Sequence, residues 1–293
     1  MKKILTILLM FVAMSSFAQK SKFVWGYFIE LKLPYVVYYT YSDLENKVND
    51  VWLWNTLTNH TDSLYAIEAK IVDNALFYCD CETIKKRNLS AECISGDSVI
   101  YSSPFEIENF YIDNGNLLVT EIDSSYEKVN IKYYVDGICF FRESVPCIPQ
   151  ELEYQIVQIF PLEDCFAITV QGDLYILDKR KKCIKKILEN CIHVDSSGNI
   201  YYGVYSEVDF LNTLYAANIK DLSKKIELIK YPHLVFAYNY ICDGKNKGCF
   251  IIGEKLYELE NMKIRQILNV RFSEEKGNTV TYNPKEGYFI LEY

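Results

Sequence analysis

Two short stretches decide the fold of this chain: Gly172-Asp173-Leu174-Tyr175-Ile176-Leu177-Asp178 and Asp195-Ser196-Ser197-Gly198-Asn199-Ile200-Tyr201. In the first, an apolar run lies between acidic turn residues. In the second, an Asp-Gly turn enters a run of the same kind. Aromatic and β-branched residues flanked by Gly, Asp, Asn and Ser are typical of short strands. Both stretches therefore predict antiparallel strands joined by tight turns.

Both stretches recur at a fixed distance. The pair Leu174–Asp178 and Ile184–Leu188 matches Leu256–Glu260 and Ile264–Leu268, which begin 82 residues later. Likewise, Gly198 lies 83 residues after Gly115 of a second Asp-Asn-Gly-Asn turn. A further copy is Leu76–Asp80, followed by Ile84–Leu89. With weaker members, a series spaced by 35 to 42 residues is Tyr65, Ile100, Phe140, Tyr175, Tyr215 and Tyr257.

Repeats of about 40 residues made of short antiparallel strands are typical of β-propellers. Through residues 172–178 and 195–201, the chain resembles the divergent β-propellers of exported bacterial proteins, of the NHL-like or TolB-like kind. The resemblance covers roughly Tyr65 to the end and implies a fold, not an activity. We predict an all-β protein: a β-propeller of six blades of about 41 residues each, with seven blades as the second choice. A pair of β-sandwich domains is the alternative.

The N-terminus predicts export. Lys2 and Lys3 precede an apolar stretch from Ile4 to Met14, and small residues stand at Ser16 and Ala18, where a signal peptidase reads. The stretch is too short to span a bilayer. We therefore interpret residues 1–18 as a signal peptide and residues 19–293 as one propeller domain. The expected location is the periplasm or the extracellular space, with no integral membrane segment after cleavage.

Charge restricts the partners. Without Lys2 and Lys3, 29 basic residues face 39 acidic ones, a net charge of about −10. A field of this sign repels phosphate backbones and argues against nucleic acid as a partner.

The chain has ten cysteines, and an even number in an exported protein favours disulfides over metal ligands. Two pairs, Cys139 with Cys147 and Cys183 with Cys191, share a spacing of eight residues. The other candidates are Cys81 with Cys93, and Cys242 with Cys249 across a predicted hairpin loop. A disulfide requires Cα atoms within about 7 Å. A zinc site formed by Cys79, Cys81 and Cys93 is disfavoured because the spacing matches no common zinc knuckle.

The resemblance implies a binding face formed by the connections between blades and between the second and third strands. We place the segments 54–62, 123–130, 206–212 and 231–234 on this face. Aromatic rings beside carboxylates suit sugar rings, whereas core positions for Trp52 and Trp54 are the alternative. The candidate ligand-binding residues are Trp54, Tyr126, Glu127, Glu207, Asp209, Tyr231 and His233.

No catalytic, cofactor or metal motif is found in the sequence, and no cofactor is predicted. The three histidines, His60, His193 and His233, do not stand at ligand spacing. The first functional hypothesis is a non-catalytic binding protein with a glycan or a protein as its ligand. The second is a carbohydrate-active enzyme, a glycosidase or a lyase, that uses Glu127, Glu207 and Asp209.

Overall fold

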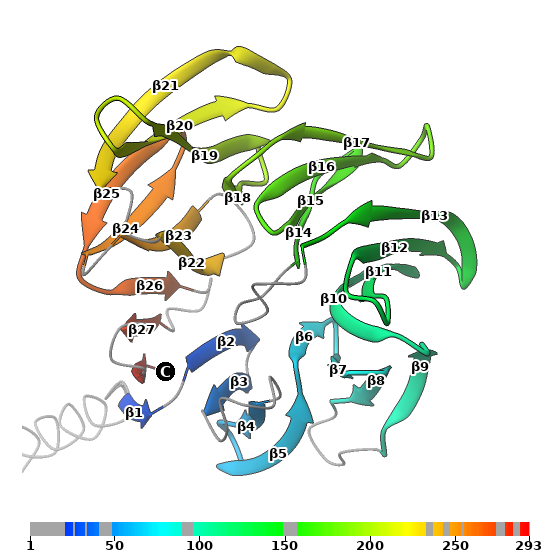
Figure 1. The fold of residues 1–293 in the computed structure, drawn as a ribbon. Helices are drawn as coiled ribbons and strands as arrows, with labels where there is room; N and C mark the ends of the chain where they lie inside the picture. Colours follow the sequence, from blue (N-terminus) through cyan, green and yellow to red (C-terminus); the bar gives the residue numbers. More distant parts are fainter. Residues whose placement is uncertain are drawn as a thin grey trace, which may run out of the picture. The chain divides into compact units, whose positions relative to one another are not determined.

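The structure is a computed structural model, and every element in its described part is a β-strand (Figure 1). It holds 28 strands and, within the described residues, no helix. The described residues are 21–25, 27–32, 34–40, 49–89, 96–148, 157–232, 237–242, 247–252, 255–273, 279–283 and 288–292. The predicted signal peptide lies outside them.

The strands form seven four-stranded antiparallel sheets, which we call blades 1 to 7 in chain order. In blades 1 to 6 each strand pairs with the next strand along the chain, so every blade is a meander (Figure 1). Blades 1 to 3 comprise β2 (Tyr27–Lys32), β3 (Tyr35–Thr40), β4 (Asn49–Asn55) and β5 (His60–Ala66); β6 (Glu68–Val72), β7 (Ala75–Asp80), β8 (Thr83–Asn88) and β9 (Ser98–Ser102); β10 (Glu106–Asp113), β11 (Asn116–Ile122), β12 (Lys128–Val135) and β13 (Ile138–Pro146). Blades 4 to 6 comprise β14 (Val157–Pro161), β15 (Cys165–Val170), β16 (Asp173–Asp178) and β17 (Cys183–Leu188); β18 (Cys191–Val194), β19 (Asn199–Ser206), β20 (Leu211–Asn218) and β21 (Asp221–Pro232); β22 (Ala237–Cys242), β23 (Lys247–Ile252), β24 (Lys255–Glu260) and β25 (Lys263–Ile267).

Blade 7 is assembled from both ends of the chain. Its strand order is β1-β28-β27-β26, and the register pairs Ser21 with Glu292 and Trp25 with Tyr288. The chain divides into two compact units, residues 1–28 with 268–293, and residues 29–267. Blade 7 lies in the first unit. Its strands are β1 (Ser21–Trp25), β26 (Val270–Ser273), β27 (Thr279–Asn283) and β28 (Tyr288–Glu292).

The middle strands of a blade are apolar because both of their faces are covered. In β15, every residue from Phe166 to Val170 is buried, although successive side chains point to opposite faces. The fourth strand of the same blade is different, since Lys185 and Lys186 of β17 are exposed. The predicted pattern of an apolar run followed by a basic and apolar run is therefore a third strand followed by a fourth.

The hydrophobic core of blades 1 to 6 is divided into clusters that lie between consecutive blades. Between blades 3 and 4, for example, Tyr133 of β12 meets Phe166 of β15, with ring centroids 5.3 Å apart. Similar clusters join blades 1 and 2, 2 and 3, 4 and 5, and 5 and 6. Each blade is thus stabilised by burial of apolar area against its neighbours, because one four-stranded meander cannot cover its own faces.

The predicted repeat is confirmed, with a count of seven blades, the second choice, instead of six. The runs at 174–178 and 256–260 are both third strands, β16 and β24. In contrast, Leu76–Asp80 falls on a second strand, β7. The series of Leu-Tyr-type positions also changes strand: Tyr65 and Phe140 lie on fourth strands, whereas Tyr175 and Tyr215 lie on third strands. No series through contiguous repeats contains blade 7, because its strands come from both chain ends.

The predicted disulfides Cys139–Cys147 and Cys183–Cys191 are wrong. Cys139 lies near the start of β13 and Cys147 directly follows its end, so about 25 Å of extended strand separates them. Cys183 pairs with Asp178 at one end of β16, whereas the backbone N–H of Cys191 bonds the Gly172 carbonyl beside the other end. Free thiols in the described residues are Cys79, Cys81, Cys139, Cys147, Cys165, Cys183 and Cys191.

The other two predicted pairs have different outcomes. Cys93 of the Cys81–Cys93 pair lies outside the described residues. Cys242 and Cys249 do lie on the two strands of the predicted hairpin, β22 and β23. The register pairs Cys242 with Gly248, and Cys249 with Ile241. Opposed residues share a face of the sheet and neighbours along a strand alternate, so this offset disfavours a crosslink between the two positions.

Candidate functional site

The connections of blades 2 to 6 divide between two edges of the sheets. One edge, which we call the linker edge, carries the turns between second and third strands and the links between blades. Its described segments are 81–82, 103–105, 123–127, 147–148, 171–172, 189–190 and 207–210. The opposite edge, which we call the hairpin edge, carries the other turns, such as 136–137 and 179–182. In blade 1, the turn at residues 56–59 joins the third and fourth strands and so belongs to the hairpin edge.

Four predicted binding residues lie on the linker edge. Tyr126 and Glu127 are exposed in the turn between β11 and β12, and Glu207 and Asp209 are exposed in the turn between β19 and β20. These turns belong to blades 3 and 5, so blade 4 lies between Glu127 and the other two acids. The structure therefore does not gather the three predicted catalytic acids on one blade.

Two other predicted binding residues belong to the core instead. Trp54 is only 1% exposed inside β4, and the turn that follows it is on the hairpin edge. Tyr231 is 7% exposed and packs in the cluster between blades 5 and 6 with Leu214 and Phe250. Burial excludes both from an open binding face. His233 lies outside the described residues.

The turn of blade 5 presents apolar side chains that the sequence analysis did not select. Val208 is 93% exposed and Phe210 is 69% exposed. Phe210 has a backbone φ of 55°, in the left-handed region that glycine and asparagine adopt at least cost. The hydroxyl of Ser206 and the backbone N–H of Leu211 bond Asp209, and the first of these bonds contributes most to lowering the pKa of this carboxyl group. Asp209 thus fixes the turn that displays Phe210.

The turn of blade 3 has the same design. Tyr126 has a φ of 57°, and its hydroxyl lies 3.5 Å from Glu106 Oε2. Asp123 Oδ1 accepts hydrogen bonds from the backbone N–H groups of Glu127 at 3.2 Å and Lys128 at 3.3 Å. An aspartate therefore holds both turns, and both place an aromatic residue in the left-handed conformation just before or within the last turn position.

Blade 4, between these two, has a turn of only two residues, Gln171 and Gly172. Gln171 also has a positive φ, of 50°, but its side chain is used within the molecule. Its Oε1 accepts the backbone N–H of Ile148 at 2.6 Å, and its Nε2 donates to the Ile148 carbonyl at 2.5 Å. These bonds fix the link between blades 3 and 4 and hold Ile148 with 66% of its surface exposed.

Exposed Phe210, Val208, Ile148 and Tyr126 therefore form an apolar series along the linker edge of blades 3 to 5. We call these four residues the edge series. Isolated exposed apolar residues are common in proteins, but several of them on one edge indicate a surface for a partner. The signal in the sequence was an aromatic or aliphatic residue inside a turn, at a position that favours Asn, Asp or Gly.

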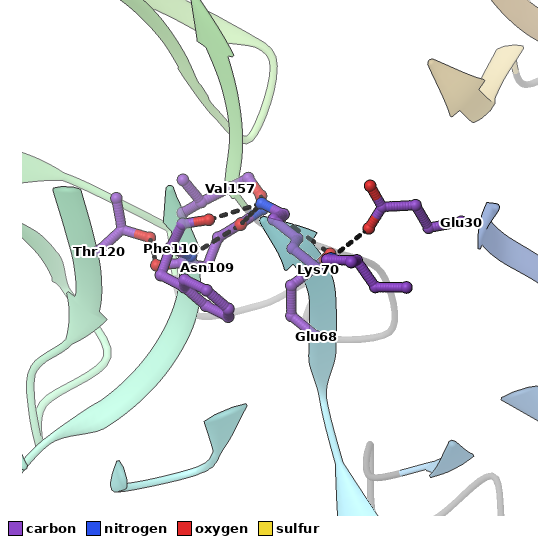
Figure 2. A network of polar contacts seen from close by, with 8 residues as sticks. Glu30, Glu68, Lys70, Asn109, Phe110, Thr120 and Val157 are labelled. Atoms are coloured by element: carbon purple, nitrogen blue, oxygen red, sulfur yellow. Dashed lines mark hydrogen bonds and ion pairs between the residues drawn. The ribbon is translucent and has the colours of Figure 1, made fainter. Parts of the chain in front are cut away.

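A second polar region connects the first strands of four consecutive blades (Figure 2). Glu30 of β2 accepts the backbone N–H of Ile71 in β6 at 2.5 Å, and burial raises the pKa of Glu30. Lys70 of β6 donates to the Phe110 carbonyl of β10 at 2.5 Å. Asn109 of β10 donates to the Val157 carbonyl of β14 at 3.0 Å. In Figure 2, Lys70 lies between Glu30 and the β10 residues. Because these side chains bond the backbones of neighbouring blades, we assign the network a structural role.

A buried ion pair connects blades 2 and 3 in a similar way. Glu121 of β11 is fully buried and lies 2.6 Å from the ammonium group of Lys132 in β12. Tyr101 of β9 donates its hydroxyl to Glu121, and burial raises the pKa of this tyrosine. A buried charge pair is retained when both partners are satisfied, as they are here.

Blade 7 carries a group of exposed aromatic residues. The ring centroid of Phe23 lies 5.2 Å from that of Trp25 and 5.0 Å from that of Tyr288, and Trp25 lies 5.9 Å from Tyr288. Trp25 is 67% exposed. The register places Trp25, Tyr288 and Asn283 in one row across three strands, so aromatic and polar residues share this face.

Searches for special groups gave two findings for the described residues. No group of three or more His, Cys, Asp or Glu side chains is placed to hold a metal ion. No described helix is long and apolar enough to cross a membrane.

Comparison with known proteins identifies the fold. No family model matches the sequence, and no curated protein matches it. Among solved structures, the β-propeller domain of the trilobed protease from Pyrococcus furiosus is similar, with a TM-score of 0.53, 16% identity and coverage of 92% of this chain and 93% of that one. The chain is a β-propeller. The WD40 β-propeller domain of Doa1 gives a TM-score of 0.51 at 10% identity, with coverage of 94% of this propeller and 97% of that one. At these identities the likeness concerns the fold alone.

Proposed function

We propose that this propeller is an exported, non-catalytic binding protein that holds a partner protein on the linker edge of blades 3 to 5. The observation that carries the proposal is the exposed Phe210 at positive φ. A left-handed conformation costs a residue other than glycine about 1 kcal/mol. This cost persists in native proteins mainly where function requires the strained residue. Phe210 makes no ring contact with any other described residue, so packing within the propeller does not offset the cost.

The experiment compares two variants of the purified chain. Phe210→Asn places a residue suited to positive φ at the tip of the turn and removes the ring. Leu57→Asn is the matched control, because Leu57 is an exposed apolar residue (77%) on the hairpin edge. Partners from the source cell are captured by crosslinking to the wild type and to each variant, and their amounts are compared by quantitative mass spectrometry.

We expect a protein that is captured by the wild type and by Leu57→Asn but lost with Phe210→Asn. A thermal unfolding scan of both variants checks that the fold is intact. Equal capture by all three proteins would remove the linker edge of blade 5 as the binding surface.

A glycan is the second candidate ligand, favoured by the rings of Phe23, Trp25 and Tyr288. Sugars present C–H groups that pack on aromatic faces, and polar side chains on the same face can bond their hydroxyls. The test is a thermal-shift screen of the chain against polysaccharides and oligosaccharides. Binding to the native state at a hundred times the dissociation constant adds about 2.7 kcal/mol of stability. A shift that Trp25→Ala abolishes would support this candidate; a shift that Trp25→Ala leaves unchanged would place the sugar elsewhere.

The carbohydrate-active enzyme receives less support from the same turns. A general acid requires a raised pKa, whereas hydrogen bonding lowers the pKa of Asp209. Glu127 lies on a different blade from Glu207. Alanine at Glu207 and Asp209 would abolish turnover of an oligosaccharide by an enzyme of this kind, and product analysis by mass spectrometry would detect that turnover in the wild type.

Export rests on the sequence of residues 1–18. The mass of the protein recovered from the source cell tests it, because cleavage after Ala18 leaves Gln19 as the first residue. A full-length mass beginning at Met1 would contradict export by this route.

A further inference from the structure

We infer that the partner binds the linker edge through a basic segment in which Lys or Arg alternates with apolar residues. This inference rests on the proposed function and names the chemistry of its partner. It is drawn from the charges around the edge series and from how this chain already pairs cations with aromatic rings.

The tip of the blade 5 turn alternates acids with apolar residues. Its four residues are Glu207, Val208, Asp209 and Phe210, and all four are exposed. A ligand that covers Val208 and Phe210 must therefore approach two carboxylates. Desolvated carboxylates are costly unless a cation meets them, so a neutral or acidic ligand would lose affinity here.

The same sign of charge continues along the linker edge. Asp123 and Glu127 flank Tyr126 in the turn of blade 3, and Glu189 lies in the link between blades 4 and 5. Lys186, the basic neighbour of that link, is already paired with Asp173 at 2.7 Å and with Glu189 at 3.0 Å.

Basic residues gather instead on the hairpin edge. The turn between β16 and β17 has the sequence Lys179-Arg180-Lys181-Lys182. Acidic and basic groups are thus separated between the two edges of the middle blades. This separation directs a basic segment toward the linker edge, where the attraction also raises the rate of encounter.

Aromatic rings of this propeller repeatedly accept cations. The ammonium group of Lys182 lies 3.8 Å from the ring centroid of Phe140, and that of Lys179 lies 4.4 Å from Phe166. Lys225 lies 4.4 Å from the ring of Tyr215. A cation over an aromatic face is favourable. Phe210 offers an exposed ring of this kind between carboxylates, and no cation of the described residues occupies it.

The test is selection from a random dodecapeptide library displayed on phage, carried out in parallel on the purified wild type and on Phe210→Asn. We expect peptides enriched on the wild type only, with Lys or Arg interleaved with apolar residues. For one selected peptide, affinity should fall as salt rises. Glu207→Gln should weaken it by about two- to fivefold, the range of an exposed ion pair. Asp209 is left unchanged in this test because it holds the turn.

The outcomes separate the inference from the proposed function. Peptides specific to the wild type but without an excess of basic residues would overturn the inference and leave the linker edge as a binding surface. Peptides that bind the wild type and Phe210→Asn equally would overturn both. Basic peptides whose affinity is unchanged by Glu207→Gln and by salt would also overturn the inference, since their charge would not be what the edge recognises.

Discussion

Blades 4 and 5 solve the same structural problem, the turn between a second and a third strand, in different ways. Blade 4 uses two residues, and Gln171 returns its side chain to the backbone of Ile148. Blade 5 uses four residues and directs Val208 and Phe210 outward. Both turns contain a residue at positive φ other than glycine. The difference indicates that the short turn serves the fold, whereas the long turn adds a surface that the fold does not need.

The largest expected effect comes from giving blade 5 the turn of blade 4. Replacing Glu207–Phe210 with Asn-Gly leaves Ser206 opposite Leu211 and suits a two-residue hairpin. The fold should persist, and affinity for the partner should fall by roughly 30- to 1,000-fold, the effect of removing an interface hot spot. Titration of the partner captured by the wild type measures this loss. Affinity within threefold of the wild type would show that the turn of blade 5 is structural like that of blade 4.

The contact between the two blades should depend on pH. His193 of β18 is buried between Phe160 and Tyr201, and burial lowers its pKa to about 4. The unfolded state, with an imidazole pKa near 6.5, binds the proton first as pH falls. Stability contributed by neutral His193 is therefore complete above about pH 6.5 and decreases towards pH 4, by up to about 3 kcal/mol.

Urea unfolding at pH 7.5, 5.5 and 4.5 measures this decrease. His193→Phe should flatten the decrease between pH 6.5 and pH 4. The exposed His60 provides the control, and His60→Gln should keep the slope of the wild type. An unchanged slope in His193→Phe would assign the pH dependence to other groups.

A smaller effect is expected from the turn of blade 4. Gln171→Ala removes both hydrogen bonds to Ile148, which should lower the free energy of unfolding by about 1–2 kcal/mol. The measurement is urea unfolding at pH 7.5. Glu189→Ala, in the next link of the same edge, should remain within about 0.5 kcal/mol of the wild type. If the two variants unfold alike, the Gln171 clamp contributes no stability.

The smallest effect has the opposite sign. Phe210→Asn should raise the free energy of unfolding by about 0.5–1 kcal/mol, because asparagine adopts positive φ at less cost than phenylalanine. Differential scanning calorimetry would record a small increase in Tm. A loss of stability would mean that the ring packs within the propeller, and the contrast between blades 4 and 5 would weaken.

The sequence predicted the strand type and the repeat because each blade needs apolar middle strands and polar turns. It did not set the phase, since third strands such as that of Tyr175 and fourth strands such as that of Phe140 share a similar pattern. Six blades were favoured because no contiguous repeat contains β1 with β28. Eight-residue cysteine spacings suggested crosslinks, but spacing along the chain carries no information about the extended strand between Cys139 and Cys147.

The candidate site was predicted in part. Tyr126, Glu127, Glu207 and Asp209 were found because aspartate- and serine-containing turns are visible in a sequence. Trp54 and Tyr231 were wrong because an aromatic residue at a strand end has the same appearance whether it is buried or exposed. Phe210 was missed because its significance depends on its backbone conformation and exposure.

The pairing of β1 with β28 also has a consequence for biogenesis. Residue 21 finds its partner only when residue 292 is available, so this sheet has the longest loop to close in the molecule and should form last. During synthesis from the N-terminus, β1 waits as an unpaired strand until the ribosome has released the end of the chain. A truncation before Tyr288 would leave that strand permanently without its neighbour and open to pairing with other chains.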